Sequence, residues 1–215
     1  MSTRDHPDFR SLLAGALARP DDPAGWLVLA DWLEERQDPA GRTVRWYGGE
    51  VLPAVLGVPD AAEPADLVAV AAAVHKLGQR PDGPALLRLF GCRCVRRLWG
   101  QLTDERSRGA VEAGELSALG LVGEGERRMA MYPAREAFRA VDASGGEGYY
   151  ATYTAYVLSE QPPVLRAEDA CDLAYAATRA AAGSDEGTPA HGREYAYQRD
   201  LAAKLAAVPP AGKEG

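Results

Sequence analysis

The chain has 215 residues, a formal net charge of −7, and 47% hydrophobic and 26% charged residues, a composition that excludes wholesale disorder. It has no run of about 18 apolar residues, so no membrane span is expected, and its first ten residues lack the apolar core of a secretory signal. Three cysteines do not make a disulfide framework, and we therefore expect a cytoplasmic protein.

The first 47 residues are predicted to form two antiparallel helices joined by a tight turn at Asp21-Asp22-Pro23. Each helix carries one apolar stripe at helical spacing, so we expect the two stripes to pack together as an αα-hairpin. The contacts expected are those of Phe9, Leu13 and Leu17 with Trp26, Leu29 and Leu33. Residues 42–47 are a third short helix or simply the exit from the hairpin.

Further helices are predicted along the rest of the chain, which has no isoleucine and many alanines, whereas strands favour β-branched residues. Their expected ranges are 64–79, 85–102, 104–120, 124–141, 167–182 and 190–208. Residues 149–158 fit a helix or a strand, and we favour the helix because no partner strand is visible elsewhere. The fold class expected is all-α, an N-terminal αα-hairpin followed by an alanine-rich multi-helix domain.

Glycine and proline clusters suggest the domain boundaries. We expect a helical module over residues 1–47, a connector with one helix over 48–83, and an alanine-rich helical domain over 84–208. Residues 209–215 are expected to form a disordered tail.

The segment from Leu17 to Gly41 contains the words RPDDPAGW and LVLADWLEERQDP. It resembles the repeat-companion domain of bacteria, whose hallmark is LVxADWLEERGDP after LxxPDDxxxR. The resemblance implies a module of about forty residues whose biochemical activity is not established. Gln37 stands where that family usually has glycine, so this helix end must form without it.

A second stretch begins at Leu87 and reads LRLFGCRCVRRLWGQLTDERSRGAVEAGE. It is similar to LRLFACACCRRVWxLLTDERSRxAVExAE, found in uncharacterised alanine-rich helical proteins from the same kinds of genome. Gly91 and Arg93 replace the usual alanines. The resemblance implies long helices beyond this point and supplies no reaction.

No metal, cofactor or catalytic site is predicted. Cys92 and Cys94 form a Cys-x-Cys pair whose thiols point about 200° apart on a helix, so buried structural thiols are the better interpretation than zinc ligands. The remaining candidate ligands are Cys171 and three scattered histidines. No Gly-x-Ser-x-Gly elbow or phosphate-binding loop accompanies His6, His75 or His191.

An acidic face on the second helix is the candidate partner-binding surface. Its residues are Asp31, Trp32, Glu34 and Glu35. An aromatic side chain surrounded by acids has the composition of an interface hot spot. Two alternatives stay open: Trp32 is wedged against the first helix, and Asp31 and Glu35 meet Arg42 or Arg45 within the module.

A candidate basic face is formed by Arg93, Arg96 and Arg97. Because the surrounding segment, residues 84–142, is only slightly basic and GC-rich codons also favour arginine, nucleic-acid binding is the second choice. The function expected is a non-enzymatic protein-interaction or scaffolding role with a protein partner and no membrane. An enzyme with an unrecognised site is the remaining alternative.

Overall fold

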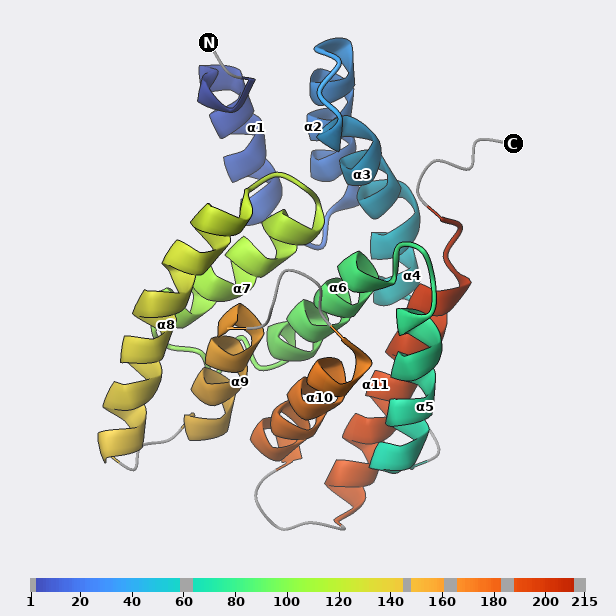
Figure 1. The fold of residues 1–215 in the computed structure, drawn as a ribbon, viewed down its shortest axis with the longest axis vertical. Helices are drawn as coiled ribbons and strands as arrows, with labels where there is room; N and C mark the ends of the chain where they lie inside the picture. The colour runs from blue at the N-terminus through green and yellow to red at the C-terminus, as the bar shows by residue number, and fades with distance from the viewer. Residues whose placement is uncertain (1–2, 59–63, 145–147, 161–165, 183–187, 211–215) are drawn as a thin grey trace. The chain divides into compact units, whose positions relative to one another are not determined.

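The computed structural model describes residues 3–58, 64–144, 148–160, 166–182 and 188–210, and every regular element in these ranges is a helix (Figure 1). The protein is therefore all-α, as predicted. The chain forms two compact units, unit 1 from residues 1–58 with 207–215, and unit 2 from residues 59–206. The predicted boundaries at 47 and 83 differ from this division, because residues 48–58 pack with the hairpin and the next helix packs in unit 2.

Unit 1 begins with the αα-hairpin. Its elements are the 3-10 helix η1 (Thr3–Asp5), α1 (Pro7–Ala18), α2 (Pro23–Glu35), α3 (Ala40–Trp46), the π-helical turn η2 (Tyr47–Val51) and α4 (Leu52–Leu56). The Asp22 carboxylate accepts a hydrogen bond from Ala24 N at 3.0 Å and caps α2, with Pro23 in its first turn.

The hairpin packing agrees in part with the expected contacts. Phe9 is buried on α1, and Trp26, Leu29 and Leu33 are buried on α2. Leu13 and Leu17 are only half-buried. The helices approach closely at Gly25, where an added Cβ would lie 3.3 Å from Ala16 Cα.

Residues 47–56 are helical, although their glycines and proline suggested a connector. Gly48 lies against Trp26, and a Cβ at this position would come within 3.0 Å of Trp26 Cβ. The glycine therefore serves close packing and does not end the helix. Pro53 is in the first turn of α4, directly after the π-helical turn η2.

The C-terminal segment belongs to unit 1. Val208 is 4% exposed, and the Pro209 carbonyl accepts a hydrogen bond from Trp46 Nε1 at 2.7 Å. Residues 209 and 210 were expected to begin a disordered tail, but the structure describes them in unit 1. Residues 211–215 of that predicted tail lie outside the described ranges.

Unit 2 is built around α6. Its helices are α5 (Leu67–Gly78), α6 (Gly83–Arg96), α7 (Glu105–Ala118), α8 (Glu124–Ser144), α9 (Tyr149–Glu160), α10 (Ala167–Ala182) and α11 (Pro189–Ala207). Every residue of α6 from Leu86 to Val95 is buried, and α6 contacts α5, α7, α9 and α10. Gly91 allows this crowding, since a Cβ there would lie 3.0 Å from Leu158 Cδ1 and 3.1 Å from Leu173 Cδ1.

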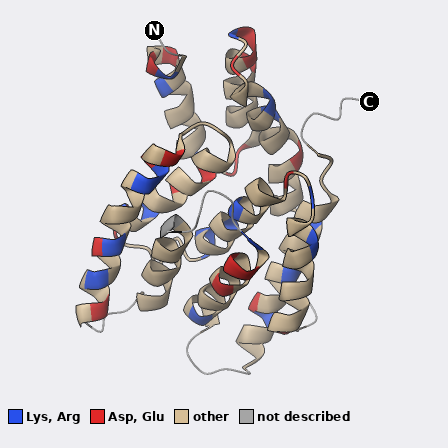
Figure 2. Cartoon of the chain, in the orientation of Figure 1, with Lys and Arg blue, Asp and Glu red and all other residues tan. Residues whose placement is uncertain are grey.

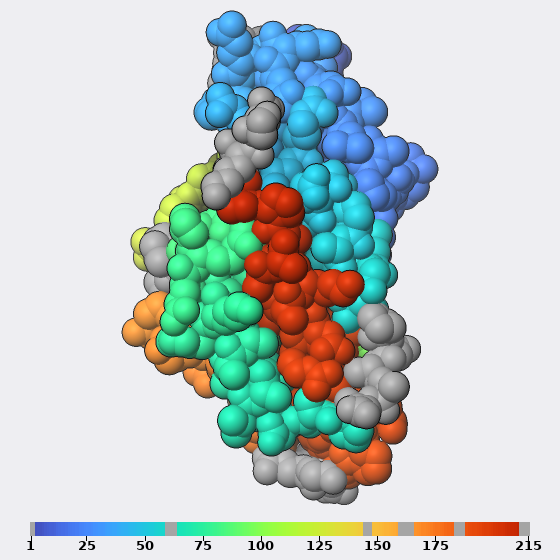
Figure 3. Space-filling model, turned by 90° about the vertical axis from the view of Figure 1, so that its right-hand side faces the viewer, coloured from blue at the N-terminus to red at the C-terminus, as the bar shows by residue number. Residues whose placement is uncertain are grey.

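Helices α5 and α11 run side by side in the same direction (Figure 3). Ala65 N, just before α5, donates to Gly192 O near the start of α11 at 2.9 Å. Arg80 Nη1, just after α5, donates to Ala206 O near the end of α11 at 2.7 Å. Both ends of the pair are therefore tied by hydrogen bonds.

Residues 149–160 form a helix, which confirms the favoured interpretation of this segment. Phe138 of α8 packs against Tyr149, Tyr153 and Tyr156, with ring centroids 5.3–5.6 Å apart. The tyrosine spacing is therefore that of one helix face packed on a neighbour. Among the described residues, none of the helices has the length and apolar character needed to traverse a lipid bilayer.

Candidate interaction surface on α2

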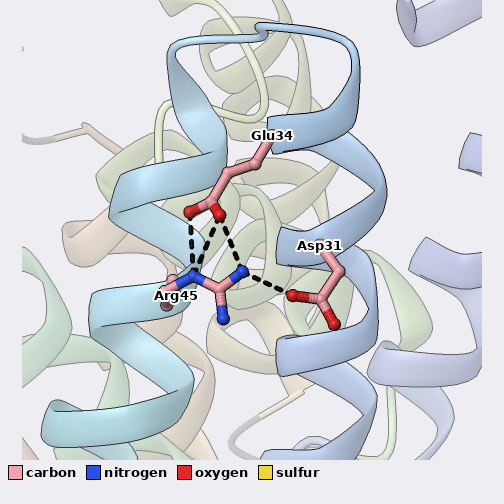
Figure 4. Close-up of polar contacts among 3 residues, drawn as sticks. All are labelled: Asp31, Glu34 and Arg45. Carbon is pink, nitrogen blue, oxygen red and sulfur yellow. Dashed lines mark hydrogen bonds and ion pairs between the residues drawn. The ribbon is translucent and has the colours of Figure 1, made fainter.

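Two of the four candidate partner-binding residues are held by Arg45 of α3 (Figure 4). Arg45 Nε donates to Glu34 Oε1 at 2.9 Å and Oε2 at 3.1 Å, and Nη2 donates to Glu34 Oε2 at 2.7 Å and to Asp31 Oδ1. The hydrogen bond from Arg45 holds the pKa of Glu34 below its usual value. Gly41 permits the approach of the two helices, because a Cβ there would lie 2.6 Å from Glu34 Cγ.

Trp32 is half-buried against α1. The Arg36 guanidinium lies 3.9 Å above its ring centroid, and the rings of His6 and Phe9 lie 5.4 and 6.0 Å away. The indole Nε1 is buried and has no hydrogen-bond partner among the described residues. Trp32 was expected either in a binding surface or wedged against the first helix. The structure combines the two, because the ring packs against α1 and part of it still faces solvent.

Asp31 is exposed but paired with Arg45, so Glu35 is the exposed acid of this surface that Arg45 does not hold. Its side chain is 74% exposed and lies 3.5 Å from Arg36 Nη1. The C-terminal end of α2 therefore presents Trp32, Glu35 and Arg36 together, which we call the α2 patch.

The three arginines of the predicted basic face have separate surroundings inside unit 2. Arg93 is only 6% exposed. Arg96 pairs with Glu115 of α7, through Nε to Oε1 at 3.0 Å and Nη2 to Oε2 at 2.6 Å. Arg97 Nε donates to Glu194 of α11 at 3.3 Å. The structure does not bring these side chains together on one exposed face.

Positive and negative residues alternate along α8, so this helix supplies no basic stripe either (Figure 2). A nucleic-acid surface would need a concentration of positive charge along one face. The described helices that carry the arginine-rich segment do not show such a concentration.

The buried acids Glu115 and Glu194 are the polar residues that sequence reasoning missed. Both are less than 7% exposed, and they pair with Arg96 at the end of α6 and with Arg97 just after it. A signal was present for Glu115, since it stands four residues from Val111 and four from Leu119 and so shares their apolar face. An acid in such a stripe predicts a buried cationic partner.

The cysteines are all free thiols. Cys92 and Cys94 are fully buried, and burial raises the pKa of both thiols. Cys92 Sγ lies 3.7 Å from Val111 O as a hydrogen-bond donor, and Cys171 is half-buried. No group of three His, Cys, Asp or Glu side chains that could hold a metal ion occurs among the described residues.

An open pocket of about 390 Å³ lies where the starts of α5 and α11 meet, lined by residues that include Asp66, His191 and Tyr195. His191 is 3% exposed, and its Nδ1 lies 2.8 Å from Thr188 Oγ1. His6 caps the start of α1 by accepting from Asp8 N, and His75 is exposed on α5. The three histidines therefore stay apart, as their spacing suggested.

The chain matches no protein-family model, no curated protein and no solved structure.

Proposed function

We propose that this chain is a non-enzymatic protein-interaction protein and that it contacts its partner through the α2 patch of unit 1. The observation that carries the proposal is the placement of Trp32, half-buried and stacked under Arg36 at 3.9 Å, beside the exposed Glu35. Tryptophan and arginine are the residues most enriched among binding hot spots. Their stacking also holds both side chains in place before a partner arrives, which lowers the entropy cost of binding.

In this proposal the acids of α2 divide into two roles. Asp31 and Glu34 hold α3 against α2 through Arg45 and keep the patch rigid. Glu35, which has no contact with Arg45, is the carboxylate offered to a partner. This assignment narrows the acids of the predicted surface to Glu35, which lies beside Trp32 and Arg36.

We further propose that unit 1 is a repeat-companion module. Its support is the φ angle of +57° at Gln37, the position where the resembled family usually has glycine. A left-handed backbone is what glycine adopts most easily, so the family's glycine suits this helix end. The three free thiols agree with a reducing compartment such as the cytoplasm.

The test compares three full-length proteins in pull-downs from the native cytoplasm with mass-spectrometric identification. These are the unchanged chain, Glu35→Lys, and the control Glu50→Lys, which reverses another exposed acid of unit 1. We expect a partner that the unchanged chain and the control both retain and that Glu35→Lys loses. Retention of every partner by a folded Glu35→Lys protein would contradict the α2 patch.

A further inference from the structure

The C-terminal segment Val208-Pro209-Pro210 belongs to unit 1 and is joined to it at Trp46. Trp46 Nε1 donates to the Pro209 carbonyl at 2.7 Å, and the side chain preceding the two prolines, Val208, is 4% exposed. Trp46 itself is 7% exposed. Two successive prolines fix φ near −65° and bias the residues before them toward extended backbone, which favours a polyproline II conformation.

The hydrogen bond from Trp46 to the Pro209 carbonyl is a contact that also occurs in a known mode of peptide recognition. Polyproline II segments dock on aromatic side chains, and their free carbonyls accept hydrogen bonds from the protein. A tryptophan indole is a donor with an apolar body, so it supplies both contacts at once. The polar contact and the buried aliphatic residue lie next to each other in the sequence, as in a short linear motif.

The described part of the segment is only three residues long. Among the described residues, the Trp46 bond is the hydrogen bond that joins residues 208–210 to unit 1. Val208 adds a buried aliphatic side chain, Pro210 is half-buried and Pro209 is exposed. Such a short attachment opens far more readily than a packed helix, because few interactions must break together.

We propose that the site on unit 1 around Trp46 is a receptor for an extended Val-Pro-type segment of a partner protein, and that the chain's own residues 208–210 occupy it as a latch. The occupant's chemistry is taken from the segment that sits there: an aliphatic side chain directly before proline, with the proline carbonyl facing Trp46. A partner segment must compete with the attached latch, which acts at a high effective concentration. The site therefore binds in trans when the latch is displaced. It is separate from the α2 patch and does not depend on it.

The experiment measures binding of a fluorescent peptide, Ala-Ala-Val-Pro-Pro-Ala, to three forms of the full chain by anisotropy. In Val208→Asp the latch is released, because a carboxylate is not accommodated at a buried aliphatic position. We expect this form to bind the peptide about tenfold or more tightly than the native chain, since the competing segment is gone. The double variant Val208→Asp, Trp46→Phe keeps an aromatic ring at position 46 but lacks the indole N–H donor. We expect it to bind the peptide about two- to tenfold more weakly than Val208→Asp does.

Two controls keep the test decisive. The first control is a peptide with Asp in place of Val, which should not bind. The second is a chain ending at Ala207, which opens the site without adding a charge and serves if Val208→Asp does not fold. The proposal is overturned if neither open form binds the Val-Pro peptide more tightly than the native chain. It is also overturned if the native chain forms a dimer that the free peptide dissociates, because the occupant is then the tail of a second copy.

Discussion

Gln37 and Gly120 occupy the same left-handed position at the ends of two helices, α2 and α7, with φ angles of +57° and +68°. At each end the N–H of this residue donates to the carbonyl three residues back, with N···O distances of 2.9 and 3.1 Å. The next N–H donates to the carbonyl five residues back, at 3.0 and 2.8 Å. Both helices therefore end in a Schellman motif, one with the usual glycine and one without it.

Replacing Gln37 by glycine should stabilise unit 1. A residue with a Cβ is strained in the left-handed backbone conformation, and glycine removes this strain. Glycine also has more freedom in the unfolded chain, which offsets part of the gain. We therefore expect the free energy of unfolding to rise by about 0.5–1 kcal/mol. Denaturant unfolding followed by circular dichroism measures the change. The reciprocal Gly120→Gln, in open space at its own helix end, should cost about 1 kcal/mol. A less stable Gln37→Gly protein would contradict this account of the α2 end.

Leu29→Ala should destabilise the hairpin strongly. Leu29 is 0% exposed, and removal of a fully buried leucine side chain leaves a cavity that costs about 2–5 kcal/mol. Val28→Ala, at the neighbouring position that is 52% exposed, is the matched control and should change stability by about 0.5 kcal/mol or less. Equal effects of the two variants in urea denaturation would show that α2 does not bury the face described here.

The Arg45–Glu34 pair should make stability depend on pH in the acid range. The hydrogen bond from Arg45 lowers the pKa of Glu34 from its ordinary value of 4.5, so the pair stabilises the fold above this pH, and the contribution is lost as the pH falls through the lowered pKa. Because both side chains are about a third exposed or more, with values of 34% and 43%, the contribution is about 1 kcal/mol or less.

The measurement compares the native chain with Arg45→Gln at pH 7 and pH 3. The stability difference should be present at pH 7 and smaller at pH 3, where Glu34 is more protonated. Arg42→Gln removes an exposed arginine of the same helix that lowers the pKa of Glu34 by its charge alone, without a hydrogen bond, and should show a smaller pH-dependent difference than Arg45→Gln. A pH-independent effect of Arg45→Gln would mean that its packing, not its charge, is what matters.

Breaking the buried pair of unit 2 should cost much more. Arg96→Leu leaves Glu115, whose side chain is 3% exposed, without its bidentate partner, and we expect a loss of about 3–5 kcal/mol. Replacing both residues by leucine should recover most of the loss, because no buried charge remains. The exposed Arg106–Asp104 pair is the control, and Arg106→Leu should leave thermal unfolding nearly unchanged.

The thiols should differ in reactivity. Burial raises the pKa of the Cys92 and Cys94 thiols, so neither forms the reactive thiolate near neutral pH, and neither is accessible. We expect a thiol-labelling reagent to modify at most the half-buried Cys171 in the native protein and all three cysteines after denaturation. Cys171→Ser should abolish native labelling. Rapid labelling of Cys92 in the folded chain would contradict the packing of α6.

The local pattern of apolar residues in the sequence was enough to predict the helices. Residues 167–182 were expected as a helix and form α10 with those bounds, because apolar spacing and alanine propensity act within a few turns of chain. The ambiguous 149–158 segment also became a helix, since the tyrosine spacing matches one face. For the α2 patch, sequence spacing selected Trp32 and Glu35 correctly as neighbours on α2.

Only the tertiary structure decided what each polar side chain and each glycine does. Glu34 meets Arg45 and Arg96 meets Glu115 across 11 and 19 residues, and Trp46 meets Pro209 across 163. Helical periodicity says which face of a helix a side chain is on, but the partner opposite that face is set by how helices distant in the chain pack. The same holds for Gly48, whose lack of a side chain suits a close contact with Trp26 that no local rule describes.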